Sequence, residues 1–335
     1  MISLMIKKYG DLEQSLEFQE IPVPVIQPNQ LLIRTQAASF NPLDYKIVRG
    51  DFKAVRKIQF PQGIGRDVSG IVEKIGKSIK GFKVGDKVFS RIDENLVGTM
   101  AEYVVSNEKD VALMPSNLSF NEAASIPLAG LTAYQSLVDV AQLSSQENVL
   151  IYAGSGGVGT IAIQLAKHLG AYVTATTSTK NVAMVKKLGS DKVIDYTKEN
   201  FQEQGRQFDV VYDTLGGEHT LNSFKVLKPG GRVISIAGDL DDVTAKQLKL
   251  NWFIRFLLSL KVKKIINTAS KLDASYRFLL MSPNGTQLKK IAELYESEMI
   301  KPIIDKTYIF EESIQALKYL SKGHAKGKVV VKMSK

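Results

Sequence analysis

The second half of the chain alternates between two hydrophobic patterns. Continuous apolar runs rich in β-branched residues, typical of buried parallel strands, are separated by segments with the 3.6-residue period of helices. The spacing between the runs leaves room for crossover helices, so six alternations predict a doubly wound parallel sheet. Two helical patterns, 121–128 and 130–140, precede the first run. The strand-like runs are 148–154, 171–177, 192–196, 208–214, 231–238 and 275–281.

The first 120 residues have a different pattern, in which strand candidates follow one another closely with glycine and proline turns between them. This succession predicts a small β-barrel. Two helical patterns near the C-terminus precede a last strand at 328–332, and this late strand indicates that the chain returns to the first domain. The first strand candidates are 30–35, 70–75, 87–89 and 101–105. The expected domains of this α/β protein are residues 1–120, completed by 301–335, and residues 121–300.

A glycine-rich loop joins the run at 148–154 to the following helical pattern. Gly154, Gly156 and Gly159 have the G-x-G-x-x-G spacing, and Ser155, Gly157 and Val158 lie between them. In this strand-to-helix context one glycine allows a tight turn, one lets a pyrophosphate approach the backbone, and one lets helix and strand pack closely. The helix N-terminus then offers unpaired N–H groups to the phosphates. The six loop residues therefore predict dinucleotide binding.

The composition excludes several chemistries. The 335 residues include no cysteine and three histidines, which rules out disulfides, thiolate chemistry and a zinc site of the usual Cys/His type. The net charge is +10, but the basic residues are spread along the chain, so nucleic-acid binding is not favoured. Neither a signal peptide nor an apolar run approaching a membrane span is visible, so we expect a cytoplasmic protein.

The end of the second strand-like run decides which dinucleotide is preferred. NAD-binding proteins place a carboxylate here to bind the ribose hydroxyl groups. Residues 176–180 read Thr-Thr-Ser-Thr-Lys instead. Ser178 and Lys180 can bind a 2′-phosphate that an acid would repel, which favours NADPH over NADH. The alternative is that Ser178 only caps the next helix and Lys180 is solvated.

Several short motifs resemble those of the medium-chain dehydrogenase/reductase superfamily. The resemblance covers essentially the whole chain. It implies a GroES-like β-barrel catalytic domain and a Rossmann domain, with the cofactor in the cleft between them. Homodimers are common in this family. The motifs are 41–46 (NPLDYK), 65–70 (GRDVSG), 84–88 (VGDKV), 130–134 (GLTAY), the glycine loop and 323–329 (GHAKGKV).

The sequence departs from the zinc-dependent members of this superfamily at their metal ligands. Those members place a Cys where Asn41 stands and a His–Glu pair where Arg66 and Asp67 stand. Their cysteine-rich lobe, expected after Phe89, is also missing. The resemblance is therefore to the zinc-independent quinone oxidoreductase and enone reductase branch. Arg66 and Asp67 are expected to form an internal ion pair with a structural role.

The resemblance also implies which side chains reach the reacting atoms, with Asn41, Tyr45 and Lys46 as the catalytic candidates. Hydride transfer to a quinone or an enone develops negative charge on a distant oxygen, which Lys46 or Tyr45 would stabilise or protonate. Alternatively, Tyr45 packs in the barrel and Lys46 only positions the ribose. Besides Lys46 and the loop, the expected cofactor contacts are Thr132, Ser178, Lys180, Tyr196, Leu215, Gly216, Ala237, Gly238 and Lys326.

The segment 251–264 has an unusual composition. Its first ten residues are mostly apolar, and Lys261, Lys263 and Lys264 follow them. This pattern predicts an amphipathic helix that contacts a membrane surface, covers the substrate cleft or lies in a subunit interface. The whole sequence predicts a zinc-free, NADPH-dependent reductase of quinones or α,β-unsaturated carbonyls. The alternatives are an alcohol dehydrogenase-like reductase of small carbonyls and a cofactor- or RNA-binding scaffold with little turnover.

Overall fold

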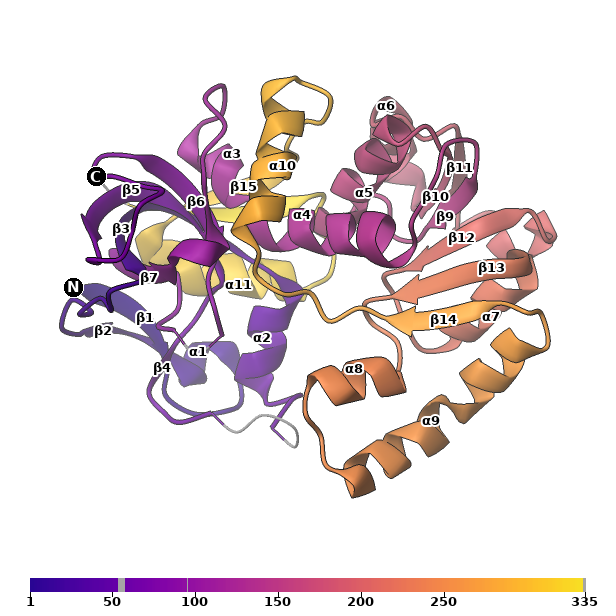
Figure 1. Ribbon diagram of the computed structural model, residues 1–335, viewed down its shortest axis with the longest axis horizontal. Helices are drawn as coiled ribbons and strands as arrows, with labels where there is room; N and C mark the ends of the chain where they lie inside the picture. The colour runs from indigo at the N-terminus through magenta and orange to yellow at the C-terminus, as the bar shows by residue number, and fades with distance from the viewer. Residues whose placement is uncertain (54–57, 95, 334–335) are drawn as a thin grey trace. The chain divides into compact units, whose positions relative to one another are not determined.

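The computed structural model describes residues 1–53, 58–94 and 96–333, and its contacts divide the chain into two units. Unit 1 comprises Met1–Leu131 and Ser282–Lys335, and unit 2 comprises Thr132–Met281. These boundaries differ from the expected ones because two helices belong to unit 1. Helix α3 (Phe120–Ala124) packs on strands β3 and β5, and helix α10 (Gly285–Glu296) packs on β8. Figure 1 shows the elements along the chain.

Unit 2 contains a six-stranded parallel sheet with the order β11-β10-β9-β12-β13-β14. The chain adds strands first on one side of β9 and then on the other, so the order reverses between β9 and β12. This arrangement confirms the doubly wound sheet that the alternating pattern predicts. The strands are β9 (Asn148–Ile151), β10 (Tyr172–Thr177), β11 (Lys192–Asp195), β12 (Phe208–Asp213), β13 (Leu227–Ser235) and β14 (Ser275–Phe278).

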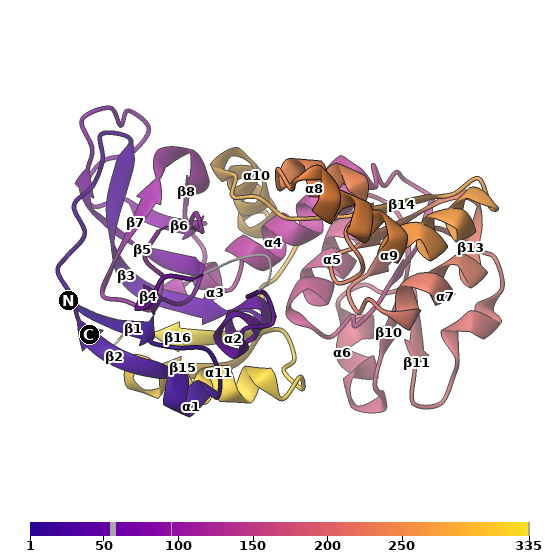
Figure 2. The ribbon, with the colours of Figure 1, turned by 90° about the horizontal axis from the view of Figure 1, so that it is seen from below.

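Helices connect these strands and cover the sheet. Residues Leu150, Val211, Phe224 and Val233 belong to one buried cluster, which the helix between β13 and β14 also joins through Ile265. That helix, α9, is the long one in Figures 1 and 2. The helices of unit 2 are α5 (Gly157–His168), α6 (Val182–Lys187), α7 (Glu218–Val226), α8 (Asp242–Gln247) and α9 (Trp252–Ser270), with shorter helical segments η2 (Gln135–Val140), η3 (Thr179–Asn181) and η4 (Phe201–Gln204).

Unit 1 contains two sheets. In the larger one the order is β15-β16-β3-β5-β6-β8, with β7 also pairing with β3, and the smaller one has the order β2-β1-β4. The late strand β16 pairs antiparallel with β3, so residues 328–332 lie in the first unit. The strands are β1 (Ile2–Ile6), β2 (Leu16–Glu20), β3 (Gln30–Phe40), β4 (Gln62–Gly63), β5 (Asp67–Ile75), β6 (Lys87–Arg91), β7 (Tyr103–Asn107), β8 (Val111–Leu113), β15 (Ile304–Ile309) and β16 (Lys328–Lys332).

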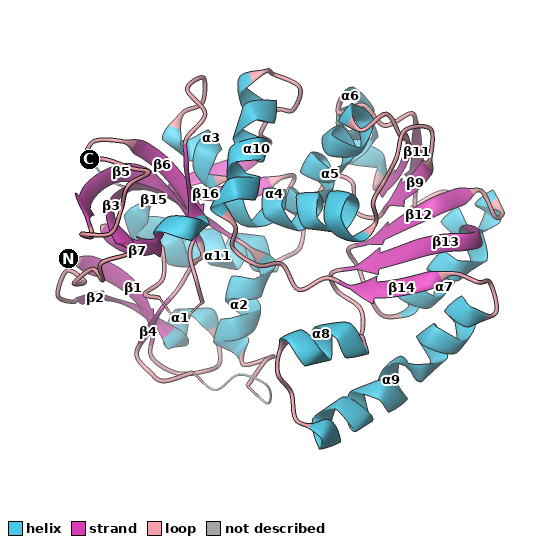
Figure 3. Cartoon of the chain, in the orientation of Figure 1, coloured by secondary structure: helices cyan, strands magenta, loops and turns pink. Residues whose placement is uncertain are grey.

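A buried cluster that includes Leu4, Phe40, Met100, Leu317 and Val331 joins the smaller sheet to strands β3 and β16 of the larger sheet and to two helices, and a second buried cluster, with Leu31 and Val68, lies on the larger sheet. Figure 3 distinguishes these helices from the strands by colour. The remaining helices are α1 (Leu12–Ser15), α2 (Pro42–Arg49) and α11 (Ser313–Ser321), with the short segments η1 (Glu108–Asp110) and η5 (Phe310–Glu312). Helix α4 (Pro127–Tyr134) contains the unit boundary.

Two elements differ from the sequence pattern for local reasons. Helix α2 was not predicted, although Pro42 is its first residue and the carboxylate of Asp44 accepts a hydrogen bond from the backbone N–H of Asn41 at 2.7 Å. Strand β13 begins at Leu227, four residues before the expected start at 231. The paired strand has a register shift between Phe208 and Val210. This shift accommodates Pro229, Gly230 and Gly231 within β13.

Candidate active site

The glycine loop occupies the turn from β9 to α5. Helix α5 begins at Gly157, and Gly156 is its N-cap. A Cβ at Gly159 would lie 2.3 Å from the carbonyl oxygen of Ala153, so only glycine allows the helix to approach the strand this closely. The first N–H groups of α5 have no acceptor within the helix, and they form the positive end of its dipole. The loop therefore fits the pyrophosphate of a dinucleotide.

The end of β10 lies beside this loop. The Ser155 hydroxyl accepts hydrogen bonds from Thr177 Oγ1 at 3.0 Å and from Asn181 Nδ2 at 3.1 Å. Ser178 occupies the N-cap of η3, but its side chain makes no capping hydrogen bond and accepts instead from Asn181 Nδ2 at 3.3 Å. Lys180 is exposed. Hydroxyl groups and one cation thus follow β10, as the sequence indicates.

The nearest carboxylate to this region belongs to the neighbouring strand and is already bound. Asp195 ends β11 and accepts hydrogen bonds from the hydroxyl groups of Thr179 and Thr197. These hydrogen bonds hold the pKa of Asp195 below its usual value. Tyr196, which follows it, is 62% exposed. The Asp195 carboxylate is therefore already hydrogen-bonded to threonines of both segments, and the aromatic ring of Tyr196 is accessible.

A buried carboxylate orders the loops after β12 and β13. Asp213 accepts hydrogen bonds from the backbone N–H groups of Leu215 and Gly216 and from the hydroxyls of Thr220 and Ser235. The Ser235 hydroxyl in turn accepts from the N–H groups of Ala237 and Gly238. One network therefore holds the four predicted cofactor contacts that follow β12 and β13. Asp213 and Ser235 were not among the predicted site residues, because each lies at the end of a strand-like run and its role depends on the loop N–H groups that it binds.

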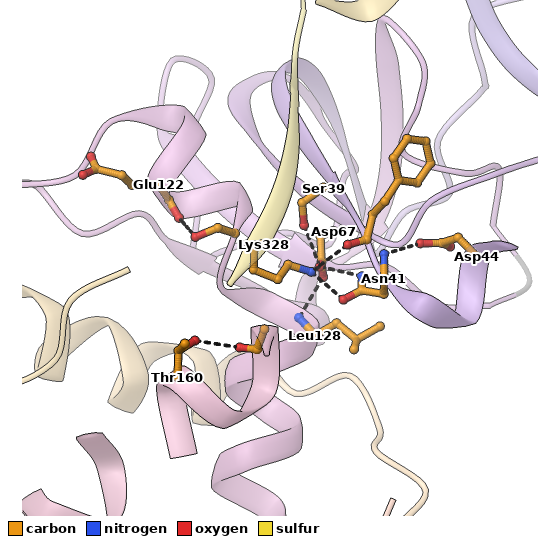
Figure 4. Close-up of polar contacts among 11 residues, drawn as sticks. Ser39, Asn41, Asp44, Asp67, Glu122, Leu128, Thr160 and Lys328 are labelled. Atoms are coloured by element: carbon orange, nitrogen blue, oxygen red, sulfur yellow. Dashed lines mark hydrogen bonds and ion pairs between the residues drawn. The ribbon is translucent and has the colours of Figure 1, made fainter. Parts of the chain in front are cut away.

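Unit 1 contains a second buried network, around Asp67 at the start of β5 (Figure 4). One carboxylate oxygen accepts from Lys328 Nζ at 3.1 Å, Asn41 Nδ2 at 2.8 Å and Ser39 Oγ at 2.9 Å. The other accepts from the backbone N–H of Leu128 at 2.7 Å. Lys328 also donates to Asn41 Oδ1 and to the carbonyl of Phe40. Asp67 is fully buried, and its charge is balanced by the equally buried ammonium group of Lys328.

This network corrects the expected pairing of Arg66 with Asp67. The cation that Asp67 contacts is Lys328, whereas the Arg66 guanidinium donates to the backbone carbonyls of Gly65 and Glu94. Arg66 precedes β5, which begins at Asp67, and its guanidinium group is bound by these carbonyls. Lys328 lies in the motif 323–329, of which only Lys326 was predicted to be a site residue. Its burial follows from the pairing of β16 with β3.

Helix α2 carries the other two catalytic candidates. Tyr45 is half-buried, packs against the unit 1 core cluster and has the Arg49 guanidinium over its ring at 5.0 Å. Lys46 is half-buried as well. Between them and the network, Asp44 is buried, and desolvation raises the pKa of its carboxyl group to about 6. Three consecutive positions of α2 therefore carry a buried carboxyl group with a raised pKa (Asp44), a phenol (Tyr45) and an ammonium group (Lys46).

The structure places the predicted residues in two sets. The unit 2 set follows the carboxyl ends of parallel strands, which meet at one edge of a sheet. In the unit 1 set, Asn41 is buried in the network while Tyr45 and Lys46 lie on α2. Thr132 is buried in α4, and Lys326 is half-buried in the turn before β16. The ring of His219 lies against those of Tyr152 and Phe201.

No group of three or more His, Cys, Asp or Glu side chains among the described residues is arranged to hold a metal ion. Within the same part of the chain, no helix combines the length and hydrophobicity needed to cross a membrane.

Comparison with known proteins places both units in one family. Residues 27–116 match the family described as alcohol dehydrogenase GroES-like domain, and residues 188–331 match the family described as zinc-binding dehydrogenase. The 2-methylene-furan-3-one reductase of Solanum lycopersicum is 39% identical over 334 residues, covering 96% of this chain and 76% of that protein. The chloroplastic NADPH-dependent alkenal/one oxidoreductase of Arabidopsis thaliana is 35% identical and covers 96% and 77%.

A solved structure agrees with these matches. The quinone oxidoreductase from Coxiella burnetii has a TM-score of 0.84 and 31% identity, covering 100% of this chain and 99% of that one. The glycine loop, the doubly wound sheet and these relatives lead to the same assignment. The chain belongs to the medium-chain dehydrogenase/reductase superfamily, in its quinone oxidoreductase and enone reductase branch.

Proposed function

We propose that this protein is a zinc-independent, NADPH-dependent reductase that transfers hydride to a quinone or to an α,β-unsaturated carbonyl compound. The named acceptors of the relatives share one chemical feature. A 2-methylene-furan-3-one, an alkenal and a quinone each carry a carbon–carbon double bond conjugated to a carbonyl group. A site for any of them must stabilise negative charge on the carbonyl oxygen after hydride reaches the distant carbon.

The observation that carries the zinc-independent part is the saturation of Asp67. Its carboxylate already accepts four hydrogen bonds, one of them from the Lys328 ammonium group. Asn41 in the same network uses its side-chain oxygen to accept from Lys328 and its side-chain nitrogen to donate to Asp67. These side chains therefore have little remaining capacity to act as metal ligands, and a lysine supplies the balancing positive charge.

The cofactor proposal rests on the fit of unit 2. The glycine loop accepts a pyrophosphate, and Ser178 and Lys180 follow β10 where an NAD-binding protein would place an acid. NADPH, when bound, would supply the hydride. Lys180 and the neighbouring hydroxyl groups would bind its 2′-phosphate by charge-assisted hydrogen bonds.

Within unit 1, Lys46 is the side chain that we assign to the carbonyl oxygen. Its ammonium group is a positioned cation on a helix whose start is held by the Asp44 carboxylate. Tyr45 is the second candidate for delivering a proton. Its ring already has packing and cation–π partners, which favours a positioning role for it. Asn41 is buried in the Asp67 network and acts by holding the start of α2.

The test is turnover of a quinone, an enone and an enal with NADPH and with NADH, before and after treatment with a chelator. We expect turnover that prefers NADPH and survives the chelator, and the best acceptor identifies the substrate class. Activity lost on chelation and restored by zinc would contradict zinc independence. Tight NADPH binding without turnover of any acceptor would contradict the reductase function and favour a scaffold.

The role of Lys46 can be separated into two parts by kinetics. If Lys46 stabilises the developing charge, Lys46→Ala should lower kcat by about 10²-fold to 10³-fold with little change in the KM for NADPH. A role limited to holding the ribose would instead raise that KM and leave kcat nearly intact. Lys8→Ala, which removes an exposed lysine from the same unit, is the matched control.

A further inference from the structure

Helix α9 exposes an apolar face that nothing in the proposed function uses. Trp252, Phe256 and Leu260 recur every fourth residue, and Phe253 and Leu257 lie beside them on the same side of the helix. These five side chains are between 49% and 77% exposed. The opposite side of α9 is buried in the unit 2 core through Val262, Ile265 and Ala269. The helix is therefore anchored by one face and presents a second apolar face outward.

Basic residues continue this outward face along α9. Lys264 and Lys271 follow Leu257 and Leu260 on the same side by helical spacing, and Lys263 lies one position away. Three acidic residues near the helix are paired with cations, and exposed Asp273 follows Lys271 by two positions. Asp239 pairs with Lys261, Asp241 with Arg277, and Asp242 with both Lys246 and Arg255. Positive charge thus dominates beyond the apolar stripe.

A cavity of about 540 Å³ lies between α7 and the C-terminal half of α9. Four cations and one carboxylate line it, together with the apolar side chains of Leu221, Phe224 and Leu272. The cations are Arg206, Lys225, Lys264 and Lys271, and the carboxylate is Glu218. Lys264 and Lys271 belong both to this cavity and to the outward side of α9. The cavity is therefore a basic continuation of the apolar face.

We propose that this surface docks the protein on a membrane that contains anionic phospholipid. The five apolar side chains enter the boundary between headgroups and acyl chains, and the basic cavity receives a phosphate headgroup. Charge decides between this occupant and a second copy of the chain. In a two-fold symmetric contact the same patch meets itself, so a second copy offers these lysines a patch that is itself basic and supplies no phosphate. An anionic membrane instead neutralises them, and the net charge of +10 adds a general attraction.

The fluorescence of Trp252 tests the proposal directly because it is the only tryptophan in the chain and is 77% exposed. Vesicles of phosphatidylcholine with phosphatidylglycerol should shift its emission to the blue, and the protein should sediment with them. Vesicles of phosphatidylcholine alone should do neither, and added salt should reverse the binding. Absence of binding to the anionic vesicles, or equal binding to both kinds, would overturn the proposal.

Two double variants test the two parts of the surface. Lys264→Gln with Lys271→Gln should weaken binding about 25-fold, at about fivefold for each lysine near an anionic surface. Phe256→Ser with Leu260→Ser should abolish sedimentation with vesicles while keeping Trp252 as the reporter. The matched controls are Lys80→Gln and Val84→Ser, exposed positions of unit 1 that should leave binding unchanged. Circular dichroism and NADPH turnover in solution check that each variant is folded.

Other occupants of the face give distinguishable results. A blue shift that depends on protein concentration, without vesicles and with a doubled mass in light scattering, would mean that a second copy covers the face. A blue shift of the Trp252 emission produced by glycerol phosphate alone, without vesicles, would mean that the cavity binds a soluble phosphate. Either result would overturn membrane docking. None of these readouts depends on hydride transfer, so failure here leaves the proposed function untouched.

Discussion

Lys328 is a residue whose role depends entirely on its surroundings. A lysine and an aspartate that are both buried cost several kcal/mol of desolvation each, and only good geometry and additional hydrogen bonds offset this cost. Here the additional hydrogen bonds come from Ser39, Asn41 and the backbone of Leu128. The pair also fixes the start of α2 relative to β16, because Asn41 contacts both partners.

Removing the Lys328 charge should therefore destabilise unit 1 more than removing both charges. Lys328→Met leaves a buried carboxylate without its cation and should cost about 3–5 kcal/mol. Adding Asp67→Asn should recover a large part of this loss, because the amide carries no charge to compensate. Urea unfolding of the two single variants and the double variant measures the coupling. Losses in the two single variants that add up to the loss in the double variant would show that the pair has no mutual stabilisation.

Asp44 gives a second prediction at the same scale, with a defined pH range. Its pKa is about 6 in the folded chain and ordinarily 3.8, so between these pH values the folded state binds more protons than the unfolded state. The stability that protonation supplies is present below the ordinary pKa and lost as pH rises through about 6, amounting to about 3 kcal/mol. The difference in unfolding free energy between Asp44→Asn and the parent should therefore change over this range. A constant difference would contradict the raised pKa.

At the scale of elements, two glycines of the glycine loop have different roles, one in the packing of α5 on β9 and the other in cofactor binding. A Cβ at Gly159 would lie 2.3 Å from the backbone oxygen of Ala153, whereas one at Gly156 would lie 3.3 Å from the same atom. Gly159→Ala should force α5 away from β9 and destabilise unit 2 by about 1–3 kcal/mol. Gly156→Ala should leave stability nearly unchanged and weaken NADPH binding, because the new methyl group stands where the pyrophosphate approaches. Thermal unfolding without cofactor and NADPH titration measure the two effects, and equal stability losses would contradict this division.

The elements also show what local sequence can predict. The inner strands β9 and β12 of unit 2 are apolar because both faces of the sheet are buried there, so each produces a run that is visible without any partner. Strand β13 began earlier than expected because its paired strand absorbs Pro229 and Gly230 at a register shift. Helix α2 was missed because its start signal, Asn-Pro-Leu-Asp, opens a helix of only eight residues. Short elements held by tertiary contacts carry a weak periodic signal.

At the scale of the whole molecule, each of the two units has its own core, and this division has a calorimetric consequence. The cores lie in separate clusters, one of which includes Phe40 and Val331 and the other Leu150 and Val233. We expect heat unfolding to show two transitions. Saturating NADPH should raise the unit 2 transition, which holds the glycine loop, more than the unit 1 transition, and stabilise the chain by about 2.7 kcal/mol at one hundred times its Kd. Gly159→Ala should lower the unit 2 transition, and a shift of both transitions by equal amounts would indicate cooperative unfolding of the units.

The sequence by itself determined the doubly wound sheet, the glycine loop between β9 and α5, and the absence of cysteine ligands. These features depend on hydrophobic period, glycine spacing and composition, which are properties of contiguous residues. Only the tertiary structure decided that Lys328 rather than Arg66 balances Asp67, that Asp213 orders the loops after β12 and β13, and that α9 presents its apolar side outward. Each of these depends on which distant segments pair or pack, and a buried charge is defined by partners that may lie hundreds of positions away along the chain.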